Sequence, residues 1–180
     1  MTATRWTPRA LTAADLPGLL AVQRACYGEG FVEGAEVFAR RLTSPVNCSL
    51  VLEHAGEVCA YLAAYRSHLN KVTPLHGDFG GGPPAAPGSA GTAAPDTLYL
   101  HDMAVLPALA GQGLARALLA PMWERARHEG LRHSALVSVQ GSQGYWERHG
   151  YAMQPLADAV QRERLATYGE GAVYMVRAIG

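Results

Sequence analysis

The sequence has almost no lysine and little charge of either sign. Lys71 is the only lysine among 180 residues, and Asp, Glu, Lys and Arg together make up 17% of the chain. The basic and acidic residues, 15 of each, give a formal net charge of zero. Without an excess of positive charge, no overall field favours nucleic acid or an anionic membrane surface. We therefore expect neither as a partner.

Long apolar runs and a cysteine framework are also missing. No stretch reaches the length of a membrane-spanning helix, and residues 1–16 contain no apolar segment of signal-peptide length. Cys26, Cys48 and Cys59 are odd in number and form no CxxC motif. They are typical of buried thiols in a reducing compartment, which predicts a cytoplasmic protein. The seven histidines show no metal-ligand spacing, so no metal is expected.

The order of predicted elements indicates the fold class. A chain of this length fits a single domain over residues 1–180. Apolar periodicity, broken by Gly and Pro, predicts strands over residues 6–11, 47–53, 58–66, 98–105, 134–139, 151–153 and 172–179. It predicts helices over residues 16 to about 28, 35–42, 114–128 and 145–149, with a polar, partly helical stretch over 158–168. This order predicts an α+β fold with one mixed, mostly antiparallel sheet and helices on both faces.

One segment differs in composition from the rest of the chain. Between Gly77 and Pro95, ten of nineteen residues are Gly or Pro. Such a segment has too little apolar surface to order itself. It is interpreted as a flexible insertion between two strands, and the alternative is a lid that orders over a substrate.

The stretch from Leu98 to Leu119 is the most informative part of the sequence. An apolar strand ends at Pro107, and Gly111-Gln112-Gly113 forms a loop with little side-chain bulk before a helix begins at Leu114. Such a loop exposes backbone N–H groups at the positive end of a helix dipole, which suits a phosphate group. The loop lacks the third glycine of a dinucleotide fingerprint and the Gly-Lys-Ser/Thr of a P-loop.

Two sequence blocks resemble those of the GNAT-type, acetyl-CoA-dependent N-acetyltransferases. The first is V-x-P-x-x-R/Q-G-x-G-x-G/A, present here as Val105-Leu106-Pro107-Ala108-Leu109-Ala110-Gly111-Gln112-Gly113-Leu114-Ala115. The second is F-Y-x-x-x-G-F, present here as Tyr145-Trp146-Glu147-Arg148-His149-Gly150-Tyr151. The element order fits over nearly the whole chain. The resemblance implies a GNAT-like acyl-CoA N-acyltransferase fold and transfer of acetyl from acetyl-CoA to a primary amine.

The resemblance also implies where acetyl-CoA binds. In the family, backbone N–H groups of the loop and the helix start hold the pyrophosphate, and the pantetheine arm pairs with the preceding strand like a further strand. The pyrophosphate residues carried over are Ala110, Gly111, Gln112, Gly113, Leu114 and Ala115, with Arg116 adding charge, and the strand residues are Met103, Ala104 and Val105. Ala110 departs from the family's Arg or Gln, which predicts some loss of affinity.

The candidate catalytic residues are His101, Asp102 and Tyr145. The family often uses a Tyr to protonate the leaving thiolate, but Trp146 occupies that position here. Tyr145 is the alternative acid. The thiolate could also leave unassisted or take a proton from water. An imidazole or a carboxylate suits the proton acceptor, and strand alternation would place His101 and Asp102 on opposite faces, so that only one faces the cleft. Each also has a purely structural interpretation: His101 and Tyr145 as core residues, and Asp102 as part of an ion pair or as an acid facing a turn.

The sequence contains no motif that identifies the acceptor. Glu29 and Glu33 lie in a region that lines the acceptor site in family members; they would favour a cationic acceptor or are simply solvated loop acids. Direct transfer is expected because no cysteine lies in either block. Two other functions fit the same residues: a non-enzymatic acyl-CoA-binding or sensing module, and a nucleotide-binding domain. The acceptor, a small molecule or a protein N-terminus, stays open, and the resemblance also allows a homodimer.

Overall fold

The structure is a computed structural model that describes residues 6–27, 29–79 and 94–180. A seven-stranded sheet has the order β1-β2-β3-β4-β5-β7-β6. Its strands are β1 (Arg9–Ala10), β2 (Leu50–His54), β3 (Glu57–Ser67), β4 (Thr97–Val105), β5 (His133–Ser138), β6 (Ala152–Met153) and β7 (Val173–Ala178). Every pairing is antiparallel except that of β4 with β5. The predicted mixed, mostly antiparallel sheet is therefore confirmed.

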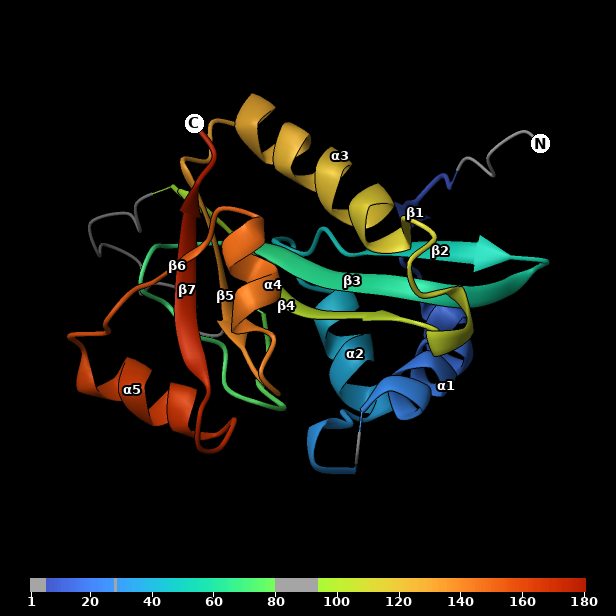
Figure 1. The fold of residues 1–180 in the computed structure, drawn as a ribbon, viewed down its shortest axis with the longest axis horizontal. Coiled ribbons are helices and arrows are strands. Elements are labelled where there is room, and N and C mark those ends of the chain that lie inside the picture. Colours follow the sequence, from blue (N-terminus) through green and yellow to red (C-terminus); the bar gives the residue numbers. More distant parts are fainter. Residues whose placement is uncertain (1–5, 28, 80–93) are drawn as a thin grey trace.

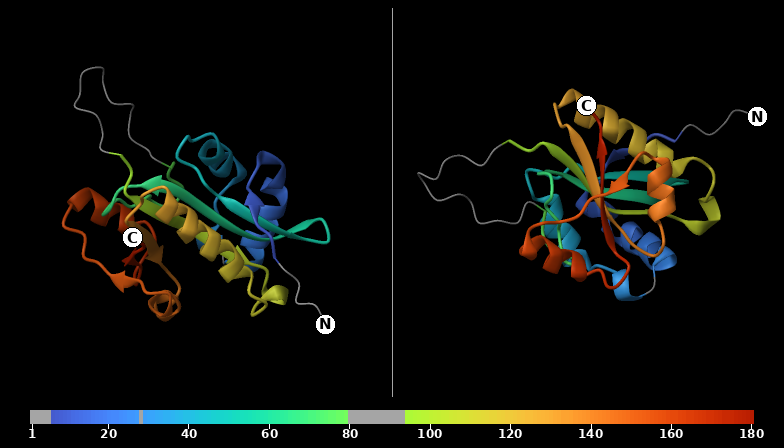
Figure 2. Two further views of the ribbon diagram at one scale, coloured as in Figure 1. Left: turned by 90° about the horizontal axis from the view of Figure 1, so that it is seen from above. Right: turned by 60° about the vertical axis from the view of Figure 1, so that its left-hand side comes forward.

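Helices cover both faces of the sheet, as predicted. They are α1 (Leu16–Cys26), α2 (Ala35–Leu42), α3 (Leu114–His128), α4 (Gln143–Arg148) and α5 (Ala159–Ala166). In Figure 1, α3 lies on one side of β3 and β4, and α1 and α2 lie on the other. Figure 2 shows the same layers from two further directions.

Each face has its own core. Against α3 and α4, Leu98 and Leu100 of β4 pack with apolar residues of α3 and with Trp146. On the opposite face, Tyr99 and Ala104 of β4 pack with residues of α1 and α2. β4 is thus buried from both sides, which explains why its sequence is mostly apolar.

The element boundaries follow local signals in the sequence. The backbone N–H of Thr12 donates to the Asp15 carboxylate at 2.8 Å just before α1, as the capping-box pattern predicts. Asp158 caps α5 by accepting from the N–H of Val160 at 2.8 Å. The first strand is shorter than predicted, with only Arg9 and Ala10 paired to β2.

The Gly- and Pro-rich segment is partly described. Most of it, residues 80–93, lies outside the described residues. The choice between a flexible insertion and a lid over a substrate therefore stays a prediction. Its first residues contradict the expectation of a segment without apolar packing: Phe79 is buried and its ring stacks on Tyr65 with centroids 4.5 Å apart. Gly77 contributes its carbonyl oxygen to Arg41. The segment therefore belongs to the core as far as Phe79.

Candidate active site

The central feature of the site is a gap between two parallel strands. β4 pairs with β5 only through Thr97–Leu100, opposite His133–Leu136. Beyond Leu136, β5 pairs only with β7, so β4 and β5 separate toward the end of β4. A cavity of about 260 Å³ opens at this point, lined by residues of both strands, α4 and the segment after α1.

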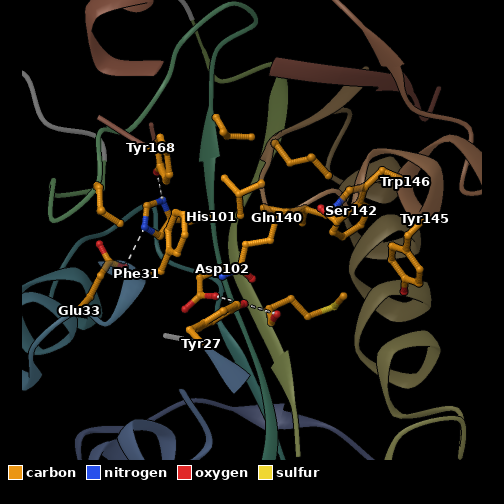
Figure 3. Close-up of a pocket in the computed structure, with 16 residues that line it drawn as sticks. Tyr27, Phe31, Glu33, His101, Asp102, Gln140, Ser142, Tyr145, Trp146 and Tyr168 are labelled. Carbon is orange, nitrogen blue, oxygen red and sulfur yellow. Dashed lines mark hydrogen bonds and ion pairs between the residues drawn. The ribbon is translucent and has the colours of Figure 1, made fainter. Parts of the chain in front are cut away.

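A β-bulge in β4 changes the expected alternation of side chains. Ala63 of β3 pairs with Asp102, whereas the next residue, Ala64, pairs with Leu100, so His101 is an extra residue in β4. A bulge of this kind places two consecutive side chains on the same face of the strand. His101 and Asp102 both line the cavity (Figure 3). The expectation that only one of them faces the cleft is therefore wrong.

The same register determines which backbone groups of β4 face the gap. The N–H of Leu106 donates to Cys59 of β3 at 2.9 Å. Because alternate residues of an antiparallel strand bond to the same neighbour, Ala104 also faces β3, while the N–H groups of Met103 and Val105 face away from it. These two N–H groups lie along the edge that β5 leaves uncovered. Ala104 has its N–H directed to β3 instead.

The loop after β4 presents further backbone donors. Gly111 and Gly113 have φ angles of +78° and +85°, and a Cβ atom at either would meet nothing within 4 Å. Glycine is needed there for the left-handed backbone and not for space. The first helical hydrogen bond of α3 is donated by Ala117 to Gly113 at 3.0 Å.

Several N–H groups of this loop are therefore available. Those at the start of α3, namely Leu114, Ala115 and Arg116, precede the first helical bond. In the described part of the chain, Gly111 and Gly113 donate no backbone hydrogen bond, whereas the N–H of Ala110 donates to Pro107 and that of Gln112 to Leu109. The available donors and the positive end of α3 together suit an anion such as a phosphate group.

His101 belongs to a buried ionic cluster. Its Nε2 lies 3.0 Å from Oε2 of Glu33, and its Nδ1 lies 3.4 Å from the hydroxyl of Tyr168. Arg41 of α2 donates two hydrogen bonds of 2.6 Å to Glu33, and the side chains of Arg41, Glu33 and His101 are about 1–2% exposed. Burial raises the pKa of Glu33, but the hydrogen bonds from Arg41 and His101 outweigh it, and the net shift is downward. Glu33 is therefore a buried, ionised residue, and its interpretation as a solvated loop acid is wrong.

Asp102 is held by two tyrosine hydroxyls. Tyr27, which follows α1, lies with its hydroxyl 2.7 Å from Asp102 Oδ1 and 2.7 Å from the carbonyl oxygen of Met103. The hydroxyl of Tyr61 on β3 bonds to the other carboxyl oxygen, Oδ2. Burial is the largest effect on this carboxyl and raises its pKa, although both tyrosine hydrogen bonds oppose the shift. The interpretation of Asp102 as part of an ion pair finds no support among the described residues, because its hydrogen-bond partners there are neutral.

Tyr145 and Trp146 lie on the opposite side of the cavity from His101 and Asp102 (Figure 3). Trp146 is 8% exposed and packs edge-on against Tyr151, whereas Tyr145 is half-buried. Burial raises the pKa of Tyr145, and no hydrogen bond is found for its hydroxyl among the described residues. Tyr145 is thus a core aromatic on one side and a wall of the cavity on the other.

Sequence reasoning missed four residues of the site: Tyr27, Arg41, Tyr61 and Tyr168. Arg41 had a usable signal, because it follows Val37 by four residues and therefore shares the buried face of α2. A buried arginine requires an acidic partner, which would have led to Glu33. The three tyrosines carry no motif, and only the packing of their elements brings them to β4.

Neither a metal site nor a membrane span is found in the described ranges. Residues 6–27, 29–79 and 94–180 hold no group of three or more His, Cys, Asp or Glu placed to bind a metal ion. No helix in these ranges is both long and apolar enough to cross a membrane.

Comparisons with known proteins identify the family. Residues 17–151 match the acetyltransferase (GNAT) family, which is three quarters of the chain. The chain therefore belongs to the acetyltransferase (GNAT) family. A search of curated proteins finds no match.

Solved structures agree with this assignment. The loading GNATL domain of CurA from Lyngbya majuscula has a TM-score of 0.71 at 16% identity, covering 98% of each chain. The ribosomal-protein-S18-alanine N-acetyltransferase from Escherichia coli has a TM-score of 0.66 at 18% identity, covering 98% of this chain and 95% of that one. The GNAT family N-acetyltransferase YhbS from Escherichia coli, in complex with CoA, has a TM-score of 0.61 at 18% identity, covering 100% and 84%. At these identities the likeness concerns the fold.

Proposed function

We propose that the chain is an N-acetyltransferase that moves acetyl from acetyl-CoA to a primary amine by direct transfer. Family membership supports acyl transfer from an acyl-CoA, and the choice of acetyl and of an amine rests on the two sequence blocks and on similar structures such as the N-acetyltransferase from Escherichia coli. The observation that carries the proposal is the gap between β4 and β5, together with the unbonded N–H groups of the loop and helix start that follow β4 in the chain.

We assign a group of the described residues to each part of acetyl-CoA. The N–H groups of Gly111, Gly113 and Ala115 would hold the pyrophosphate, with Arg116 exposed beside them to add positive charge. The pantetheine arm would pair with the edge of β4 that β5 leaves uncovered, at the N–H groups of Met103 and Val105, in the position that a paired β5 would otherwise fill. The thioester would then reach the cavity between β4 and α4.

The reaction needs a proton acceptor, an oxyanion donor and a proton for the leaving thiolate. A neutral amine attacks the thioester carbon, so a carbon–nitrogen bond forms as the carbon–sulfur bond breaks, and the ammonium proton passes to His101 or Asp102. Whichever of the N–H groups of Met103 and Val105 does not pair with the pantetheine arm would donate to the developing oxyanion. Tyr145, on the α4 side, would protonate the thiolate.

A thiol-release assay with a panel of amines tests the proposal. The protein is incubated with acetyl-CoA and each amine, and free CoA is measured alongside the acetylated product by mass spectrometry. Amine-dependent release of CoA with formation of the amide is expected. Binding of acetyl-CoA by calorimetry without turnover would favour the non-enzymatic acyl-CoA-binding module, and a larger melting-temperature shift with ATP than with CoA would favour a nucleotide-binding domain.

Cellular location is a further proposal. A cytoplasmic location is supported by the three cysteines, all of which are free thiols in the structure.

A further inference from the structure

The hydrogen bonds that connect Asp102, Tyr27, Tyr61 and the carbonyl of Met103 require more hydrogens than the two tyrosines can donate. Three contacts connect the group: Tyr61 to Asp102 Oδ2, Tyr27 to Asp102 Oδ1, and Tyr27 to the carbonyl oxygen of Met103. Each tyrosine hydroxyl has one hydrogen to donate, and a carbonyl oxygen has none. An ionised Asp102 adds no hydrogen, so two hydrogens would serve three contacts.

A protonated Asp102 completes the set. Its hydroxyl donates to Tyr27, Tyr27 donates to the carbonyl of Met103, and Tyr61 donates to the remaining oxygen of Asp102. Each contact then has one donor and one acceptor. With an ionised carboxylate, the Tyr27 oxygen would instead face one of its two acceptors across 2.7 Å with no hydrogen between them.

The surroundings of Asp102 favour the uncharged carboxyl. From β3 it faces the neutral Tyr61, from the end of α1 it faces Tyr27 and the Cys26 thiol, and from the segment before α2 it faces the negative charge of Glu33. The hydrogen bonds from Tyr61 and Tyr27 and the imidazole of His101 oppose these effects, but His101 is bonded to Glu33, and Arg41 also donates to Glu33. Burial and the neighbouring carboxylate act together, and both raise the pKa of Asp102.

We infer that Asp102 carries a proton in the resting protein and acts with Tyr27 as a positioning residue for the β4 edge, which leaves His101 as the proton acceptor. The assignment of roles to His101 and Asp102 rests on the proposed acetyl transfer, whereas the protonation of Asp102 does not. Glu33 accepts from Nε2–H of His101 and so leaves Nδ1 as the basic nitrogen. Tyr168 lies beside that nitrogen, but its hydroxyl donates to the carbonyl of Thr73 at 2.7 Å.

Vibrational spectroscopy tests the protonation state without any turnover. Asp102→Asn is the matched variant, because its amide N–H can donate to Tyr27 and its amide oxygen can accept from Tyr61. The infrared difference between wild type and Asp102→Asn at neutral pH is expected to contain the carbonyl stretch of a protonated carboxylic acid. A pair of carboxylate bands in its place would overturn the inference. If this variant fails to fold, a ¹³C NMR titration of the Asp102 carboxyl carbon in the wild-type protein gives the same decision, because an ionised carboxyl at neutral pH contradicts the inference.

Kinetics then test the division of roles, provided that the wild type turns over. Loss of a general base lowers kcat by about 10²–10⁴-fold and removes the acidic limb of the pH–rate profile. His101→Gln is expected to do both. Asp102→Asn is expected to keep the acidic limb, with a smaller loss of kcat. The reverse pattern would assign proton acceptance to Asp102 and overturn the inference. If the wild type shows no turnover, the proposed function fails while the spectroscopic test still decides the charge of Asp102.

Discussion

Replacing Arg41 by Met should cause a large loss of stability. The Arg41 side chain is 1% exposed, donates two hydrogen bonds of 2.6 Å to Glu33, and donates two more to the carbonyl of Gly77 at 2.9 and 2.7 Å. Its removal leaves a buried carboxylate with no arginine partner. Breaking a buried ion pair in this way costs about 3–5 kcal/mol of unfolding free energy. For a protein of this size, that corresponds to a fall in Tm of about 6–20 °C.

The neighbouring residue provides the control. Arg40 lies next to Arg41 on α2 and pairs with Asp78 at 3.0 Å, but both of these side chains are about half exposed. Arg40→Met should cost less than about 1 kcal/mol, because an exposed ion pair contributes little. Urea unfolding of both variants at neutral pH measures the difference. Similar losses for the two variants would refute the claim that burial makes the Arg41–Glu33 pair important.

A double variant separates the lost pair from the charge left behind. Adding Glu33→Gln to Arg41→Met removes the unpaired carboxylate, so it should recover part of the lost stability. A double variant less stable than Arg41→Met alone would show that the charge left on Glu33 is not the source of the loss.

Three further predictions concern the loop, the leaving group and the pH dependence of stability. Gly113→Ala should weaken CoA binding measured by calorimetry. The control is Gly130→Ala, at the other end of α3, where the glycine has a similar φ of +79° and the same open surroundings; it should cost a similar stability of about 1–2 kcal/mol and leave CoA binding unchanged. Equal CoA affinities of the two variants would contradict the assignment of the loop to CoA binding. Tyr145→Phe should lower kcat at saturating acetyl-CoA by about 10²-fold, and an unchanged kcat would mean that the thiolate leaves without it. The pKa of Asp15 is lowered to about 2, chiefly by hydrogen bonds from Arg9. Asp15→Asn should therefore cost about 1–2 kcal/mol above pH 4. The difference should shrink between about pH 4 and pH 2 and vanish below about pH 2, and a pH-independent difference in urea unfolding would contradict this.

Most of the fold could be predicted because its signals are local. Pro107 and the glycines around it mark where β4 ends and α3 begins, and the predicted helix over residues 114–128 has the observed bounds. Apolar periodicity located the strands to within a few residues. The first strand was predicted too long because only Arg9 and Ala10 meet a partner in β2, and pairing depends on the partner.

The chemistry of the site was harder to predict because it depends on register and on distant contacts. A bulge in β4 has no marker in the sequence, yet it alone brings His101 and Asp102 to the same face. From the sequence alone Glu33 resembles a solvated loop acid. Its burial depends on Arg41, eight residues later on α2, which donates to it in the folded structure. Tyr27 reaches Asp102 only because α1 packs against β4. The roles of the residues predicted to bind acetyl-CoA stay predictions, although the structure places the N–H groups of Met103 and Val105 along the gap.

A structure of the complex with CoA is the most direct test of whether CoA binds in the gap between β4 and β5. We expect the pyrophosphate within hydrogen-bond distance of the N–H groups of Gly111, Gly113 and Ala115. We expect the pantetheine chain between β4 and β5, with its amides paired to β4 at Met103 and Val105. CoA bound elsewhere on the molecule, or a gap closed by pairing of β4 with β5 beyond Leu100, would contradict the account.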